Sequence, residues 1–243
     1  DWWAPRGLRV LGAPAEADTP LAALGELGGA VGEPGFVAQF LDQAFEGYRA
    51  FLNKVQAATL EADASWSRVQ AGAGLLRALP RLLHLFRALP PETTLSLAEK
   101  ADAATLSTYE KLLTAKLTSS PQQTQAALPT RLGGSGLLRF KELRAQAWLG
   151  SWLGTLPAVR ALAGAGLASC EALTQGPQSW AVALRESLEE LAQEGVYLDQ
   201  AGAVVRERPA QLWGWEDGSP ALAQRQRLLS RARSEAARSR LLL

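Results

Sequence analysis

The stretch that begins at Pro34 constrains the fold most strongly, because its apolar residues recur at the spacing of a helix. Steps of four and three residues separate Val37, Leu41, Ala44, Tyr48, Phe51 and Val55. Such a stripe lies along one side of an α-helix, and it is widened by Phe36, Phe40, Phe45 and Leu52. Pro34 suits the first turn of that helix. We interpret the stripe as a side that packs in a core rather than as a binding site.

The same kind of spacing predicts a mostly helical chain. Further helices are expected over residues 64–89, 91–117, 121–128, 140–156, 157–173, 178–194 and 220–243. A short hairpin is expected over 196–205, and a loop over 207–220. The fold class that we predict is therefore mostly α: an irregular multi-helix bundle with an extended N-terminal arm and a basic C-terminal helix.

Proline and glycine divide the chain into segments. Residues 1–34 are rich in both and show no sustained period, which favours an extended arm. Pro80 is expected to split or kink the helix over 64–89, because proline lacks a backbone donor. A division near Pro157 gives three predicted units: an arm (1–34), a helical domain (35–157) and a helical C-terminal extension (158–243).

Cysteine and histidine, which often act in catalysis, are scarce in this chain. The chain has one cysteine, Cys170, and one histidine, His84, which excludes an intrachain disulfide and a cysteine-rich zinc site. We expect both residues to be packed in the core, and a hydrolase that uses His84 is the weaker alternative. The glycines within 133–136 lack the following lysine of a phosphate-binding loop, so we interpret them as a structural turn. The sequence predicts no catalytic residue, no cofactor and no metal site.

Composition also bears on location. The net charge is +1, so no overall basic field favours nucleic acid. The longest uncharged apolar stretch, 145–159, is too short and too broken for a transmembrane segment. The chain begins with Asp1 and contains no Met. We therefore expect a mature protein from which a targeting peptide has been removed, located in a mitochondrion or plastid.

Positive charge is concentrated in the last predicted helix. Its cationic residues are Arg225, Arg227, Arg231, Arg233, Arg238 and Arg240, set against Glu235. On a helical wheel Arg227, Arg231 and Arg238 share one side, and the apolar residues share another. Arginine at this density suits phosphate contacts, because its guanidinium binds two oxygens at once. The alternatives are a solvated helix face or a face that pairs with an acidic partner.

Aromatic residues mark two further candidate interfaces. Trp2 and Trp3 lie in the predicted arm, and Trp213 and Trp215 lie in the predicted loop before the last helix. Exposed tryptophan is unfavourable unless a partner covers it, and aromatic residues dominate interface anchors. We predict that these tryptophans contact other protein subunits.

Five segments carry a resemblance to a known family. In chain order they are Gly7 to Pro14 (GLRVLGAP), Gly35 to Leu41 (GFVAQFL), Leu89-Pro90-Pro91, Gln125 to Leu137 (QAALPTRLGGSGL) and Ala147 to Trp152 (AWLGSW). Together they resemble the region downstream of the palm in reverse transcriptases of non-LTR (LINE-like) retrotransposons of algal and protist type. The resemblance covers residues 6–157.

This resemblance implies a fold and a position beside nucleic acid, but it implies no catalytic activity. In the family, the region is a thumb-side helical segment beside the template and primer. The polymerase carboxylates belong to a Tyr-x-Asp-Asp motif of the palm, and no Asp-Asp pair occurs in this sequence. No catalytic residue is therefore carried over. The resemblance implies a helical remnant put to another use, with nucleic-acid contact as an inherited property.

Taken together, the sequence predicts a structural or assembly subunit of a larger complex, without enzymatic activity. Its partners are expected to be other protein subunits, with RNA contact through the basic helix as a further expectation. Two alternatives stay open: an RNA-binding component of a ribonucleoprotein such as an organellar ribosome, and a fragment of an active reverse transcriptase.

Overall fold

The computed structural model describes residues 34–57, 72–163, 179–198, 204–205 and 225–242. The described part is mostly helical, which confirms the predicted fold class at that level. Its longer helices are α1 (Pro34–Ala57), α4 (Pro91–Leu113), α6 (Phe140–Ala163), α8 (Ser179–Gln193) and α9 (Arg225–Leu241). The predicted arm, Cys170 and all four tryptophans of the candidate interfaces lie outside the described residues.

Short elements connect the long helices. They are η3 (Leu79–Leu82), α3 (Leu83–Ala88), α5 (Ser120–Ala127), η4 (Thr130–Leu132) and the strands β1 (Tyr197–Leu198) and β2 (Val204–Val205). Residues 72–78 are also helical. The two strands pair antiparallel, with Tyr197 opposite Val205, as the expected hairpin requires. The break expected at Pro80 is present as the 3₁₀ segment η3.

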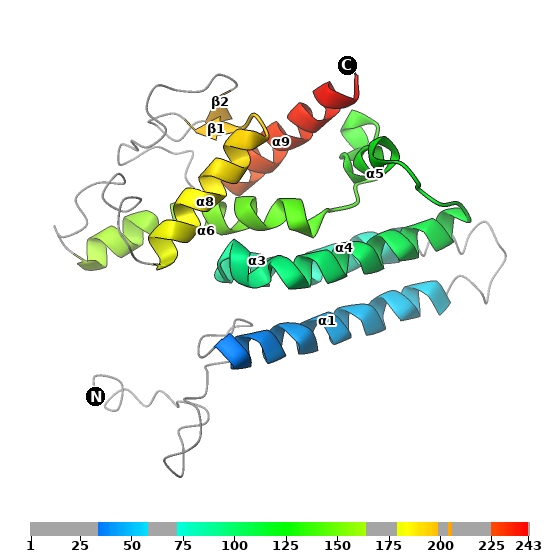
Figure 1. Ribbon diagram of the computed structural model, residues 1–243, viewed down its shortest axis with the longest axis horizontal. Coiled ribbons are helices and arrows are strands. Elements are labelled where there is room, and N and C mark those ends of the chain that lie inside the picture. Colours follow the sequence, from blue (N-terminus) through cyan, green and yellow to red (C-terminus); the bar gives the residue numbers. More distant parts are fainter. Residues whose placement is uncertain (1–33, 58–71, 164–178, 199–203, 206–224, 243) are drawn as a thin grey trace, which may run out of the picture.

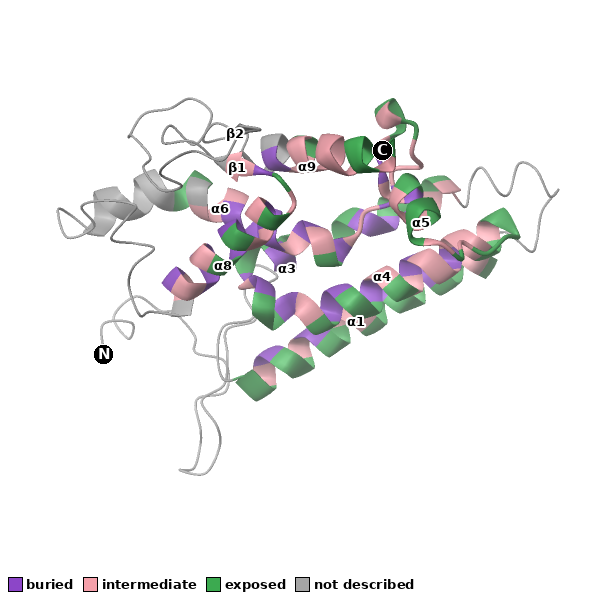
Figure 2. Ribbon diagram, turned by 45° about the horizontal axis from the view of Figure 1, so that its top comes forward, coloured by how far each residue is buried: buried purple, intermediate pink, exposed green. Residues whose placement is uncertain are grey.

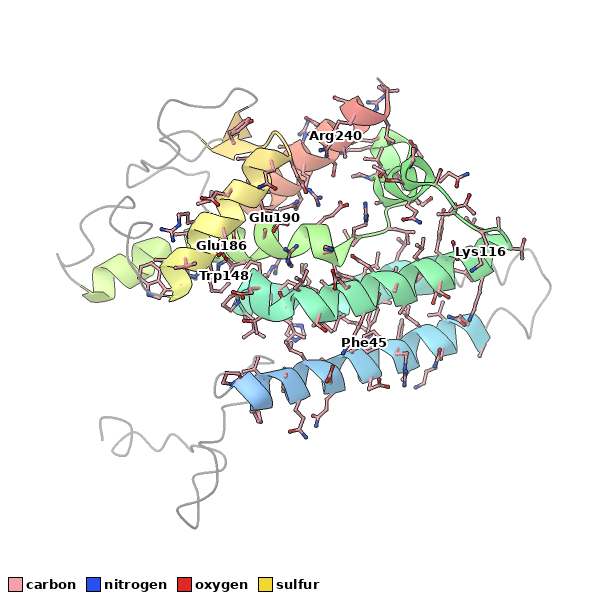
Figure 3. The ribbon with its side chains drawn as sticks, viewed as in Figure 1. Phe45, Lys116, Trp148, Glu186, Glu190 and Arg240 are labelled. Atoms are coloured by element: carbon pink, nitrogen blue, oxygen red, sulfur yellow. The ribbon has the colours of Figure 1, made fainter. Side chains whose placement is uncertain are left out.

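The larger core forms where α1, α3, α4 and α6 meet (Figure 1). Three aromatic rings mark its centre: the Phe140 ring lies 5.4 Å from that of Phe86 and 5.8 Å from that of Tyr48. The Tyr48 hydroxyl lies 2.7 Å from the Thr105 hydroxyl, so its polar end is satisfied inside the core. Phe45 extends from α1 toward α4 (Figure 3). The amphipathic stripe therefore packs in the core, as its spacing predicts.

A smaller core joins the C-terminal elements to α6. It contains Leu149 of α6, Leu229 of α9 and the α8 residues Leu184, Leu188 and Leu191, together with Val196. Helix α6 thus contributes to both cores, and residues 145–149 in its first half are all buried (Figure 2). This helix fixes α8 and α9 to the rest of the bundle.

Three local predictions are wrong. The helix expected to end at Leu156 runs through Pro157 to Ala163, because the backbone angle of proline fits a helix. The helix expected to end at Leu117 stops at Leu113, because Thr114 takes a left-handed conformation with φ of 53°. His84 is exposed rather than packed in the core. The division into three units stays a prediction, with α6 continuous across residues 157 and 158.

A carboxylate on α4 caps the start of α6. Asp102 accepts hydrogen bonds from the backbone N–H groups of Phe140 at 2.6 Å and Lys141 at 3.0 Å. Burial raises the pKa of Asp102, while the two backbone amides lower it. These bonds satisfy donors that every helix leaves free at its first turn.

We expect Asp102→Ala to reduce the free energy of unfolding by about 1 to 2 kcal/mol, the typical value of an N-cap. Asp42→Ala is the matched control, because Asp42 is exposed and pairs with Lys100 at the surface at 2.7 Å. An exposed pair contributes about 0.5 kcal/mol or less. Urea unfolding followed by circular dichroism measures both. Equal losses in the two variants would contradict the capping role.

Candidate functional site

The C-terminal helix α9 is fixed to the bundle along one side. Leu229 is fully buried in the smaller core, and Ala232 packs against the same cluster. The Ser230 hydroxyl donates to the amide oxygen of Gln146 on α6 at 3.0 Å. Gln146 is itself buried, so this bond satisfies a polar group that would otherwise be costly. The apolar side that the sequence assigns to this helix is the side that packs inward.

Arg233 does not belong to the exposed basic face. Its side chain is 11% exposed and lies between two carboxylates, with Nη2 2.8 Å from Glu142 Oε2 and 2.6 Å from Glu194 Oε1. Burial lowers the pKa of Arg233 to about 10, while Glu142 and Glu190 raise it, so the side chain stays charged at neutral pH. This arginine holds α9 against α6 and against the residues that follow α8.

A second ion pair reinforces the same junction. Arg144 of α6 binds Glu190 of α8 through both terminal nitrogens, at 3.0 and 2.9 Å. Such two-pronged pairs are geometrically specific. The junction also holds an aromatic cluster, in which Trp152 stacks on Trp180 at 5.1 Å and meets Trp148 edge-on at 6.1 Å. Glu190 and Trp148 mark the place in Figure 3. These contacts are internal and join α6 to α8.

The exposed arginines of α9 form the candidate site. Arg231 and Arg238 are both exposed, and their separation of seven residues puts them on the same side of the helix. Arg240 is exposed on the last turn of α9 (Figure 3). Arg225 and Arg227 lie in the first turn of α9, and their side chains are outside the described part.

Arg131 of η4 joins this surface. Its Nη1 lies 3.5 Å from Glu235 Oε1, and the Nε of Arg231 lies 3.1 Å from the same oxygen. Two guanidinium groups therefore share one carboxylate, and Arg238 adds a third cation one turn further along. We call Arg131, Arg231 and Arg238 the basic surface. It has positive charge in excess and can bind carboxylate or phosphate oxygens.

The sequence pattern does not identify Arg131 as a site residue, because it predicts only a structural turn there. That turn is tightly built. Gly133 takes φ of 82°, a left-handed conformation that ends η4. The backbone N–H of Gly136 then donates to the Leu128 carbonyl at 2.9 Å, which folds the loop back onto α5. The sequence signal that points to this site is an arginine, Arg131, within a glycine-rich turn.

The described residues contain no group of three or more His, Cys, Asp or Glu side chains placed to hold a metal ion. Among the helices that the structure describes, none is long and apolar enough to cross a membrane.

Comparison with known proteins gives no relative. No protein-family model matches the chain, no curated protein matches it, and no solved structure matches it. The resemblance to reverse transcriptases therefore stays a prediction.

Proposed function

We propose that the chain is a non-catalytic structural or assembly subunit of a larger complex, bound to another protein subunit through the basic surface. The observation that carries the proposal is the division of the arginines on α9. Arg233 is largely buried and locks the helix in place, whereas Arg231 and Arg238 are exposed, and Arg231 shares the Glu235 carboxylate with Arg131. A rigid helix that presents a charge excess is suited to docking, because its partner meets side chains that are already positioned.

The resemblance to the thumb-side region of reverse transcriptases makes this subunit, under the same proposal, a helical module put to a new use. We also propose that the complex belongs to a mitochondrion or plastid. Recovery of the chain entirely in the cytosolic fraction would contradict that location.

A second candidate is an RNA-binding component of a ribonucleoprotein. The guanidinium groups of the basic surface favour it, since arginine forks match phosphate oxygens as well as carboxylates. RNA contact predicts an affinity that falls steeply with salt, because each neutralised phosphate releases a counterion.

Reversal of charge on the basic surface tests the proposal. We expect Arg131→Glu combined with Arg238→Glu to reduce co-purification of protein partners about tenfold, because like charges at an interface oppose binding. The measurement is isolation of the tagged chain from its native cells at low salt, with and without ribonuclease. Lys54→Glu, on the exposed side of α1, is the single-charge control.

Partners that survive ribonuclease, stay with Lys54→Glu and are lost from the double variant support the assembly subunit. Loss of all partners after ribonuclease supports the RNA-binding candidate instead. A native chain that purifies as a monomer contradicts both.

A further inference from the structure

The basic surface lies next to an open, mostly apolar groove of about 470 Å³, whose polar lining residues are Gln122, Gln125 and Ser135. The groove lies between the end of α4, α5, the η4 turn and the last turn of α9, and Figure 1 shows the end of α9 beside α5. Its apolar lining consists of Leu117, Pro121, Ala126 and Leu241, with Tyr109 at one side. Pro121 is exposed, and Leu117 and Leu241 are half-buried, so the lining is open to a partner.

The two walls that carry the arginines also line the groove. Gly133 and Leu241 are lining residues; Arg131 precedes Gly133 in the same turn, and Arg238 precedes Leu241 by almost one helical turn. An apolar floor with cations on its rim matches a ligand that has apolar groups in the middle and negative charge at the edge.

The backbone of the walls restricts what such a ligand can be. The lining belongs to helices, a tight turn and the irregular segment that follows α4. In that segment the Leu117 N–H donates to Glu110 Oε1 at 2.9 Å, and the Leu117 carbonyl accepts from Gln123 Nε2 at 3.0 Å, so these backbone groups already have partners. No strand edge borders the groove in the described part of the chain, so an incoming peptide finds no ladder to extend. A helix suits such a groove, because its backbone groups bond within the helix and need no ladder from the partner.

The aromatic content argues against a nucleic acid as the ligand. Tyr109 is the one aromatic residue of the described lining, and its hydroxyl lies 2.5 Å from that of Ser135. Proteins that hold single-stranded nucleic acid stack successive bases on exposed aromatic faces. A half-buried tyrosine that is fixed by a hydrogen bond gives no such series.

We infer that this groove binds an acidic amphipathic helix of a partner protein, with apolar side chains on Leu117, Pro121 and Leu241 and carboxylates against Arg131 and Arg238. The inference rests on the proposed function and names the chemistry of the partner at that site. Apolar contact then supplies binding energy, and the arginines orient the helix and speed its association.

The test measures the binding of a fluorescently labelled synthetic peptide to the full chain by fluorescence anisotropy. The peptide has 18 residues, with leucines at helical spacing and glutamates elsewhere. Three probes are its controls: the same residues in scrambled order, the same pattern with lysine for glutamate, and an 18-nucleotide oligouridylate. We expect the amphipathic acidic peptide to bind with a Kd at least about tenfold lower than that of each control.

Two variants locate the site. Arg131→Glu with Arg238→Glu reverses the rim charge, and Leu117→Ser removes part of the floor; each should weaken peptide binding about tenfold. Lys54→Glu should leave it unchanged. Circular dichroism of every variant confirms that helix content and the thermal midpoint are retained, and Leu117→Ala replaces Leu117→Ser if the latter unfolds.

Equal binding of the scrambled peptide would overturn the inference that the groove binds an amphipathic helix, since charge alone would explain the affinity. Preferential binding of oligouridylate would overturn it in favour of nucleic acid. Absence of binding by all four probes would overturn it as well. If the native chain still retains protein partners after ribonuclease in that last case, the proposed function stands and this groove is not its docking site.

Discussion

Replacement of Gly134 with alanine is expected to destabilise the fold by about 3 kcal/mol or more, beyond the usual cost of overpacking. A Cβ atom on Gly134 would lie 1.9 Å from the carbonyl oxygen of Leu128 and 2.4 Å from its carbonyl carbon. Both atoms belong to the backbone, so no side-chain rotation relieves the clash. The loop would have to move away from the end of α5.

Movement of the loop is costly because hydrogen bonds hold it there. The Leu128 carbonyl accepts from Gly136 N–H at 2.9 Å, and the Ala126 carbonyl accepts from the N–H of Leu137 at 3.2 Å. Leu128 and Leu137 are both buried, so displacement of the loop also opens the core. A buried backbone group without its partner adds a further cost of about 1 to 3 kcal/mol.

Gly47→Ala is the matched control for this effect. Gly47 lies in the middle of α1, where a Cβ atom would meet nothing within 4 Å. Alanine there should increase the free energy of unfolding by about 0.5 to 1 kcal/mol, because it is the better helix former. Denaturant unfolding of the two variants should therefore give changes of opposite sign. Changes of the same sign and size would contradict the close approach at Gly134.

Arg233→Ala is expected to cost about 3 kcal/mol, at the lower end of the range seen when one partner of a buried ion pair is removed, because these pairs are largely but not fully buried. The change leaves Glu142 and Glu194 facing each other without the cation between them. The two carboxylates then repel, and α9 loses its main polar link to α6. The effect should appear in equilibrium unfolding and as increased proteolysis of the C-terminal helix.

Arg231→Ala tests the same residue type on the same helix in an exposed position. Its side chain is 66% exposed and pairs with Glu235 one turn away, so its removal should change stability by about 0.5 kcal/mol or less. A loss at Arg231 as large as that at Arg233 would contradict the division between a buried and an exposed set of arginines.

The sequence predicts those parts of the fold that depend on local periodicity. The stripe of α1 is one example: Val37, Leu41 and Tyr48 are buried as their spacing requires. The apolar side of α9 is another, because Leu229 lies fully inside the smaller core. In both cases a single helical period separates the inner side from the outer side, without knowledge of the partner helix.

Where the sequence-based prediction fails, a tertiary contact or a local distortion of the helix determines how the residue is placed. His84 follows the 3₁₀ segment η3, in which the helical phase changes; Leu85 and Phe86 then face the core and His84 faces outward. Arg233 looks like any other arginine of its helix, since Glu142 and Glu194 come from distant parts of the chain. Pro157 marks no helix end because the loss of one hydrogen bond does not stop α6.

The candidate site was predictable only in part for the same reason. The helical period puts Arg231 and Arg238 on one side of the last helix. The contribution of Arg131 depends on how α5 and the η4 turn pack beside α9, which no local pattern encodes. The groove beside the basic surface likewise arises from four segments that are separate in the sequence.

Photo-crosslinking from position 238 in native cells tests the central claim most directly. A photoreactive residue in place of Arg238 lies on the exposed side of α9, and one in place of Lys54 on α1 is the control. The account predicts a discrete protein adduct from position 238 that survives ribonuclease and does not form from position 54. Adducts to RNA alone, or the same adducts from both positions, would contradict a protein partner at the basic surface.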